Sequence, residues 1–143
     1  MLHLKEGNWI FIRMDDGEDF YKTLYKILKI YNIESGLIVG ATGMLKNFKI
    51  GWFNDETHLY EVEEIETPHE LLSLNGNISL KDEEIFAHIH ASLGTPDRKA
   101  VGGHLFEALI YNTVEMAVWK FNHILLEREK KEGFRPIMGR FKD

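Results

Sequence analysis

The sequence predicts an α+β domain, built as one strongly bent and mostly antiparallel sheet of about seven strands with one main helix packed on it. Two observations favour this class. Apolar or alternating segments separated by short links recur along most of the chain, and such neighbours usually pair as antiparallel strands. Helical periodicity is clearest in one stretch, residues 20–31. With 143 residues and 44% hydrophobic content, the chain is predicted to form a single domain over residues 1–143.

The first elements are predicted to be a strand and then the helix. Trp9 to Met14 is largely apolar on both faces, which is typical of a strand covered on each side. The acidic turn Asp15 to Asp19 precedes the helix, where carboxylates meet the positive end of the helix dipole. Residues 20–31 carry apolar side chains at i, i+4, i+7, i+8 and i+11, which favours a helix packed on a sheet. These residues are Phe20, Leu24, Ile27, Leu28 and Tyr31.

A second stripe on the same helix is basic and consists of Lys22, Lys26 and Lys29. These lysines are candidates for contacts with nucleic-acid phosphates, although such a stripe is more often a solvated helix face. The whole chain is acidic, with a formal net charge of −6 and a pI of about 5.6. A domain that binds duplex DNA by itself usually has a basic footprint. The charge therefore disfavours DNA binding by this domain alone.

The middle of the chain predicts further strands. Gly36 to Ala41 reads as a buried strand, and Leu45 to Phe53 forms a predicted hairpin with His58 to Ile65. Two interpretations are open for Glu70 to Leu80. The pair Asn75-Gly76 is a strong signal for a two-residue hairpin turn, but the segment is also consistent with one long strand that has a glycine kink.

Three histidines are the candidate metal ligands. His88 and His90 are two residues apart, so on a strand both side chains point to one face. If the chain returns antiparallel after the loop of residues 94–100 with Leu93 opposite Val101, His90 lies opposite His104 and the three imidazoles converge. Three neutral imidazoles suit a borderline ion such as zinc. The alternative is a polar strand face on which the histidines make ordinary hydrogen bonds.

Residues 101–110 and 113–121 are predicted to be two strands joined at Tyr111-Asn112. Glu107 fits its apolar surroundings least well. It is either a residue at a subunit contact, a partner that orients one of the imidazoles from behind, or an edge carboxylate in water. A regular strand puts Glu107 on the face opposite to His104, and a bulge at Gly102-Gly103 would change this.

The same segment has more apolar side chains than one small core obviously needs. We therefore expect an exposed apolar sheet face that another surface must cover. They are Phe106, Ile110, Val114 and Trp119.

Four motifs in order resemble the PPC domain family, also called DUF296. They are GEDF, SGLIVGATGML, HELLSLNGNISL and HIHASLGTPDRKAVGGHL. The resemblance implies a homotrimer and favours the single long strand over residues 70–80. Plant members of the family carry the domain beside AT-hook DNA-binding motifs. Arg135-Pro136 resembles a fragment of an AT-hook core, but the order Arg-Gly-Arg-Pro is missing.

Two functions of different class follow. The favoured hypothesis is a stand-alone PPC domain, a trimeric metal-binding or interaction module whose relatives are described as DNA-binding. The alternative is a small zinc-dependent enzyme in which His88, His90 and His104 leave one coordination position open. The chain has no cysteine, and no apolar run approaches the length of a membrane span. A cytoplasmic location without membrane attachment is therefore expected.

Overall fold

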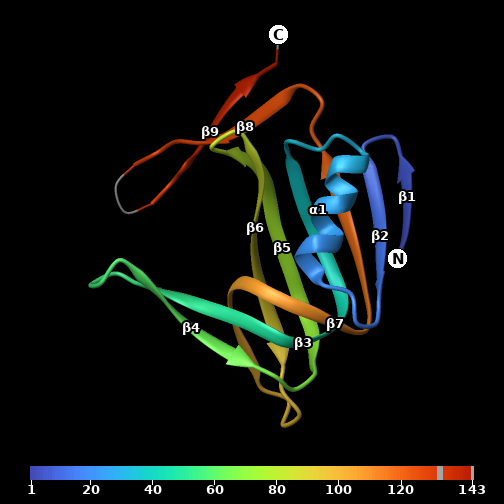
Figure 1. Cartoon of the computed structure of the whole chain (residues 1–143), viewed down its shortest axis with the longest axis vertical. Coiled ribbons are helices and arrows are strands. Elements are labelled where there is room, and N and C mark those ends of the chain that lie inside the picture. The colour runs from blue at the N-terminus through green and yellow to red at the C-terminus, as the bar shows by residue number, and fades with distance from the viewer. Residues whose placement is uncertain (132–133, 143) are drawn as a thin grey trace.

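The computed structural model describes residues 1–131 and 134–142, which form one helix and nine strands joined in a single sheet (Figure 1). This confirms the predicted α+β class, with nine strands rather than about seven. The strands are β1 (Leu2–Glu6), β2 (Trp9–Asp15), β3 (Gly36–Asn54), β4 (Leu59–Ile65), β5 (His69–Lys81), β6 (Glu84–Gly94), β7 (Ala100–Lys120), β8 (Ile124–Arg128) and β9 (Ile137–Phe141). The helix α1 spans Phe20–Ile30. The additional strands are β1 and the C-terminal hairpin of β8 and β9.

Two strands, β3 and β7, run through most of the sheet and bend with it. Each was expected to be two separate strands, but β3 has 19 residues and β7 has 21. The expected breaks are bends. Gly43 has a φ of +138° beside a register shift in the β3 and β7 pairing, and Asn112 has a φ of +60°. Such irregularities turn a strand without ending it.

Strand β5 is one long strand, as the family resemblance favoured, and the hairpin alternative at Asn75-Gly76 is wrong. Both residues pair with β6 in regular register, Asn75 with His90 and Gly76 with Ile89. A β-carbon at position 76 would overlap the carbonyl oxygen of His88. Glycine therefore permits the close approach of β5 to β6. Because β3 and β6 each pair with both β5 and β7, these four strands form a closed ring of pairings.

The main core lies between α1 and the sheet. Asp19 caps the helix, and its side chain accepts a hydrogen bond from the Lys22 amide at 2.9 Å. The buried stripe of α1 packs on alternate residues of β2 and β7, and Ile10 and Val118 have no exposed surface. In the described part of the chain, no helix has both the length and the apolar character that crossing a membrane requires.

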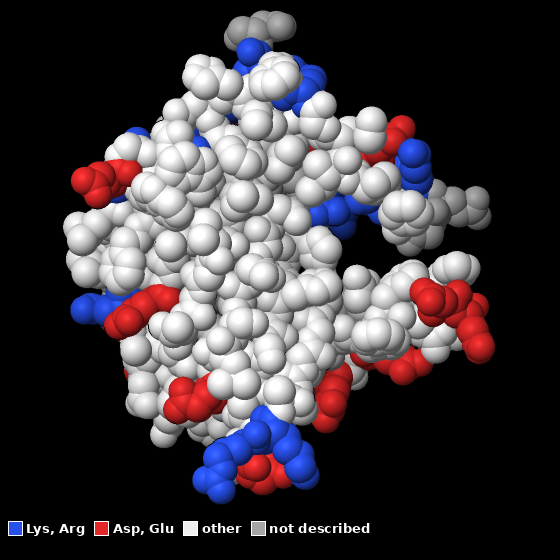
Figure 2. Space-filling view, turned by 180° about the vertical axis from the view of Figure 1, so that it is seen from behind, with Lys and Arg blue, Asp and Glu red and all other residues white. Residues whose placement is uncertain are grey.

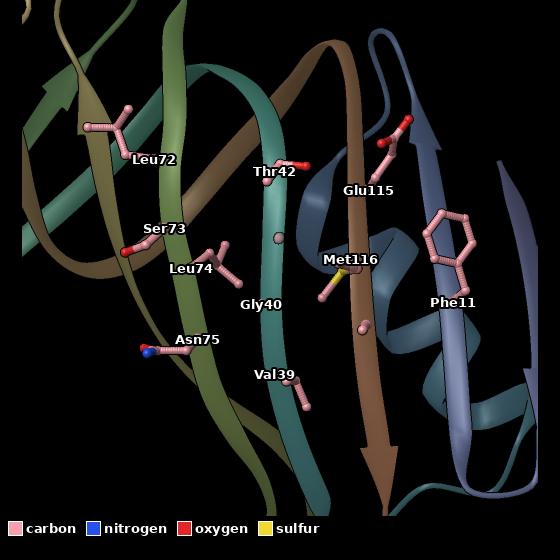
Figure 3. Close-up of a pocket in the computed structure, with 12 residues that line it drawn as sticks. Phe11, Val39, Gly40, Thr42, Leu72, Ser73, Leu74, Asn75, Glu115 and Met116 are labelled. Carbon is pink, nitrogen blue, oxygen red and sulfur yellow. The ribbon is translucent and has the colours of Figure 1, made fainter.

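The opposite face of the sheet is apolar and exposed. Figure 2 shows a broad surface with few charged side chains on the side of the sheet that faces away from α1. Figure 3 shows part of this face, with α1 behind the strands, and a shallow hollow of about 490 Å³ lies there. Glu115 is the one charged residue among the described residues that line the hollow. We call it the outer face, and its large exposed side chains are Trp9, Phe11, Leu37, Val39 and Leu72.

An exposed apolar sheet face was expected, but its residues differ in part from the predicted set. Ile110 and Val114 are fully buried in the core of this chain. Phe106 contacts His104 on another surface, with ring centroids 4.4 Å apart. Trp119 packs edge to face against Trp9 at 4.6 Å.

Candidate metal centre

Strands β6 and β7 place the three histidines on one surface. His90 lies directly opposite His104, and Leu93 lies opposite Val101, which confirms the predicted register. His88 is two residues before His90 on β6 and points to the same side. The pairing is regular from Ala100 to His104.

The imidazole nitrogens converge. One ring nitrogen from each of His88, His90 and His104 can be chosen so that all three lie within 4.8 Å of one another. The Nε2 atoms of His88 and His90 are 3.1 Å apart. Two ligands of a tetrahedral zinc ion lie about 3.3 Å apart, given Zn–N bonds of about 2.0 Å. The spacing therefore fits two nitrogens bound to one ion.

His104 supplies an independent sign of fit. Its Nδ1 atom is buried and has no hydrogen-bond partner within the described ranges. Buried polar atoms are nearly always paired, so an unpaired one needs an explanation. A metal ion could bind the lone pair of this Nδ1 atom. If the ring is rotated by 180° about its bond to Cβ, Nε2 takes the neighbouring place of Cε1 and could bind the ion instead. The donor set and its geometry thus fit a bound transition metal.

The electrostatic environment keeps two of the rings neutral. Burial, followed by the positive charge of Arg128, lowers the pKa of His88 to about 4. Burial also lowers the pKa of His104 to about 4, with a smaller contribution from His88. A neutral imidazole has the free lone pair that a metal needs. Near neutral pH these two side chains are therefore in the form that can act as ligands.

Strands β5 and β8 add neighbours that sequence reasoning missed. Nη2 of Arg128 on β8 lies 3.3 Å from Nδ1 of His88 and donates to the side chain of Asn77 on β5 at 2.9 Å. When the Nε2 lone pair of a neutral His88 binds a metal, the ring proton is on Nδ1, so Nδ1 cannot then accept a hydrogen bond from Arg128. The sequence of residues 125–131 does not predict the contact between Arg128 and His88. This contact depends on the parallel pairing of β8 with β5 at Leu80.

Aromatic side chains cover the other side of the histidines. The ring of Tyr60 on β4 lies 5.1 Å from that of His104 and 5.1 Å from that of Phe106. These residues line a cavity of about 860 Å³ that opens onto all three histidines. The site is therefore a half-enclosed pocket.

Glu107 does not join the site within this chain. Its carboxylate lies 2.9 Å from Nζ of Lys49 on β3. No hydrogen bond found among the described residues connects Glu107 to an imidazole, so the predicted orienting role has no support here. The bulge lies at Phe106 and not at Gly102-Gly103, because Lys49 pairs with Glu107 while Ile50 pairs with Leu105. The extra residue turns Glu107 toward solvent.

The three lysines predicted to contact phosphates are not part of the histidine cluster. Lys22, Lys26 and Lys29 are all exposed on α1, and Lys22 lies 3.7 Å from the carboxylate of Asp19. Their proposed contact with phosphates stays a prediction. Arg135 binds Asp82 at 2.6 Å and lines the cavity beside Pro136.

Comparison with known proteins decides the family. The profile of the Plants and Prokaryotes Conserved (PCC) domain, also abbreviated PPC, matches residues 1–122. The chain belongs to the PCC domain family. No curated protein matches it significantly.

Solved structures of other proteins share the fold across almost the whole chain. A PPC protein from Pyrococcus horikoshii is 32% identical, with 95% of this chain and 94% of that chain covered and a TM-score of 0.83. A metal-containing protein from Archaeoglobus fulgidus is 31% identical, with 96% and 99% covered and a TM-score of 0.85. A candidate DNA-binding protein from Bacteroides thetaiotaomicron is 25% identical, with 98% and 96% covered and a TM-score of 0.88.

Proposed function

We propose that this PCC-domain protein is a homotrimeric metal-binding module in which His88, His90 and His104 hold one divalent transition metal ion, with zinc the best fit. The observation that carries the proposal is the convergence of three imidazole nitrogens within 4.8 Å. Three neutral nitrogen donors suit zinc better than magnesium or calcium, which prefer oxygen. The metal-containing relative from Archaeoglobus fulgidus supports the same interpretation.

The zinc-dependent enzyme is the weaker candidate. When bound by three histidines, zinc would supply a Lewis acid with one open position. Hydrolysis would also need a general base near that position. No Asp or Glu is among the described residues that line the cavity. Burial raises the pKa of Tyr21, and its hydroxyl already donates to the carbonyl of Leu105, so it is a poor base. The residues support binding better than catalysis.

Elemental analysis tests the metal proposal. Protein purified without added metal, and then saturated with zinc and dialysed, should retain about one zinc ion per chain, as a three-histidine site requires. Dialysis against a strong chelator should remove the ion, and re-addition should restore it. Zinc retention no greater than that of an unrelated protein without a histidine cluster would contradict the proposal.

We propose that the outer face is the surface through which three copies of the chain contact one another. Phe11, Val39 and Leu72 are 44%, 49% and 56% exposed and surround the hollow on this face. Apart from Glu115, the described residues that line the hollow are uncharged. A largely apolar surface of this kind is uncommon on a monomer and usually marks an interface. Contact with two further copies of the chain would remove it from water, in agreement with the family resemblance.

A charge placed on the outer face tests the assembly. Wild-type protein should show the mass of three 16.7 kDa chains by light scattering. Val39→Glu should give monomers, because burying an unpaired carboxylate in the subunit interface costs roughly 3–5 kcal/mol. The control is Ile30→Glu on α1, which changes a similarly exposed apolar residue away from the outer face and should leave the mass unchanged. A monomeric wild-type protein would contradict the proposal.

DNA binding is not proposed as the main function. The candidate DNA-binding relative from Bacteroides raises the idea, and the exposed lysines of α1 are its best residues in this chain. However, the net charge of −6 opposes binding to a polyanion. The exposed carboxylates at the tip of the β3 and β4 hairpin, among them Asp55 and Glu56, add to this barrier.

A further inference from the structure

The cavity beside the three histidines has aromatic walls. Seven of the residues that line it have aromatic side chains other than histidine and come from α1, from strands β3, β4, β6 and β7, and from the segment before β9. They are Tyr21, Tyr25, Phe53, Tyr60, Phe86, Phe106 and Phe134. The volume of about 860 Å³ lies in the range of small-molecule sites, which are typically lined by apolar and aromatic groups with a few polar ones. The walls suit a flat or apolar organic body.

The same cavity carries positive charge in an otherwise acidic protein. Lys81, Arg128 and Arg135 line it, and no carboxylate does so among the described residues. Arg135 is compensated by Asp82 outside the lining. The Lys81 ammonium and the Arg128 guanidinium lie 4.7 Å and 5.1 Å from the centroid of the Phe86 ring. Cationic and aromatic groups are thus interleaved on one wall.

Arg128 is a cation held by neutral acceptors. Its guanidinium donates to Ser79 Oγ, Asn77 Oδ1 and the carbonyl of Arg135, and its Nη2 lies 3.3 Å from Nδ1 of His88. A guanidinium has five N–H donors, so at least one donor has no acceptor within residues 1–131 and 134–142, and a second is free when a metal-bound His88 carries its proton on Nδ1. No carboxylate of these residues forms an ion pair with Arg128. A partly buried cation without a counter-ion is costly, and an anion from solution would offset that cost.

We infer that the cavity binds a small organic carboxylate with a flat aromatic body. Its charged group lies beside Arg128 and the histidines, which one carboxylate can reach together because Arg128 lies 3.3 Å from His88. Its ring packs against the aromatic wall that includes Phe86, Tyr60 and Phe106. The inference rests on the proposed metal site for part of the attraction, since a divalent ion on neutral imidazoles adds positive charge. Arg128 and Lys81 supply the rest independently of the metal.

Matched probes test the charge requirement. Para-fluorobenzoate and para-fluorobenzamide have nearly the same shape, but only the first is an anion, and fluorine NMR reports the binding of both. The benzoate should bind the zinc-loaded protein at least about tenfold more tightly than the benzamide, as charge-assisted hydrogen bonds predict. With Co²⁺ in place of zinc, the fluorine signal of the bound benzoate should broaden strongly, which places the probe beside the histidines.

Variants assign the preference to Arg128. Arg128→Gln should bring the two probes to within about threefold of each other, because the charged donor is lost. Arg128→Lys keeps the charge and should keep most of the preference. Arg140→Gln changes an exposed arginine of the same hairpin, paired with Glu127 at 3.4 Å, and should behave as wild type. Zinc retention should persist in Arg128→Gln, since the substitution removes a positive charge beside the ion.

The outcomes separate this inference from the metal proposal. Equal binding of the two probes to zinc-loaded wild type, or absence of cobalt broadening, would overturn the inference and leave the metal site intact. An Arg128-dependent preference for benzoate in a protein that retains no zinc would overturn the metal proposal alone. The wild-type comparison decides the matter even if Arg128→Gln does not fold.

Discussion

His104→Ala should reduce the affinity for zinc by more than about a hundredfold, a larger loss than removal of an outer hydrogen-bond partner of a ligand usually causes. The substitution removes one of three protein ligands and the buried nitrogen that has no other described partner. His88 and His90 alone would leave half of a tetrahedral shell to water. Competition with a coloured chelator measures the change directly.

His123→Ala is the matched control, because His123 is exposed and lies outside the histidine cluster. It should retain zinc as wild type does. Unfolding by urea should show that both variants are folded, so that loss of metal in His104→Ala is not loss of structure. Unchanged zinc affinity in folded His104→Ala would remove both the metal-binding module and the zinc enzyme from consideration.

Gly76→Ala should destabilise the protein by about 3 kcal/mol and weaken zinc binding as well. Its new β-carbon would overlap the carbonyl oxygen of His88 on the neighbouring strand, and the backbone cannot give way as a flexible side chain can. Overpacking of this kind typically costs about 1–3 kcal/mol. Separation of β5 from β6 would also move His88 away from His104. Urea unfolding measures the first effect and chelator competition the second.

Gly139→Ala tests whether any added methyl group in a strand has this effect. A β-carbon at position 139 meets only the side chain of Leu126, at 3.6 Å, which is an ordinary contact. The substitution should change the free energy of unfolding by less than about 1 kcal/mol. Equal stability of Gly76→Ala and Gly139→Ala would show that the approach of β5 to His88 is not tight in solution.

The histidine site was largely predictable because strand geometry has a period of two. Once His88 and His90 share a face, only the register of the returning strand is needed, and the loop of residues 94–100 sets it. The helix was predictable for a similar reason, since its apolar stripe from Phe20 to Leu28 is complete. The helix and the histidine site were therefore both predictable from the local periodicity of the sequence.

Other features depend on contacts that are distant in sequence. Arg128 reaches His88 only because β8 lies beside β5, and no local pattern predicts that neighbour. The facing of Glu107 depends on a bulge at Phe106 that no glycine marks. The continuity of β7 through Asn112 was missed because a polar residue suited to a turn can also adopt a positive φ inside a bent strand.

The pairing of β2 with β7 has a consequence for biosynthesis. Trp9 lies opposite Trp119, so an early strand finds its partner only after almost the whole domain has left the ribosome. Contacts between such distant parts of a chain slow folding. A nascent fragment that stops short of residue 104 also lacks a third imidazole. Binding of the proposed metal would therefore follow the synthesis of most of the domain.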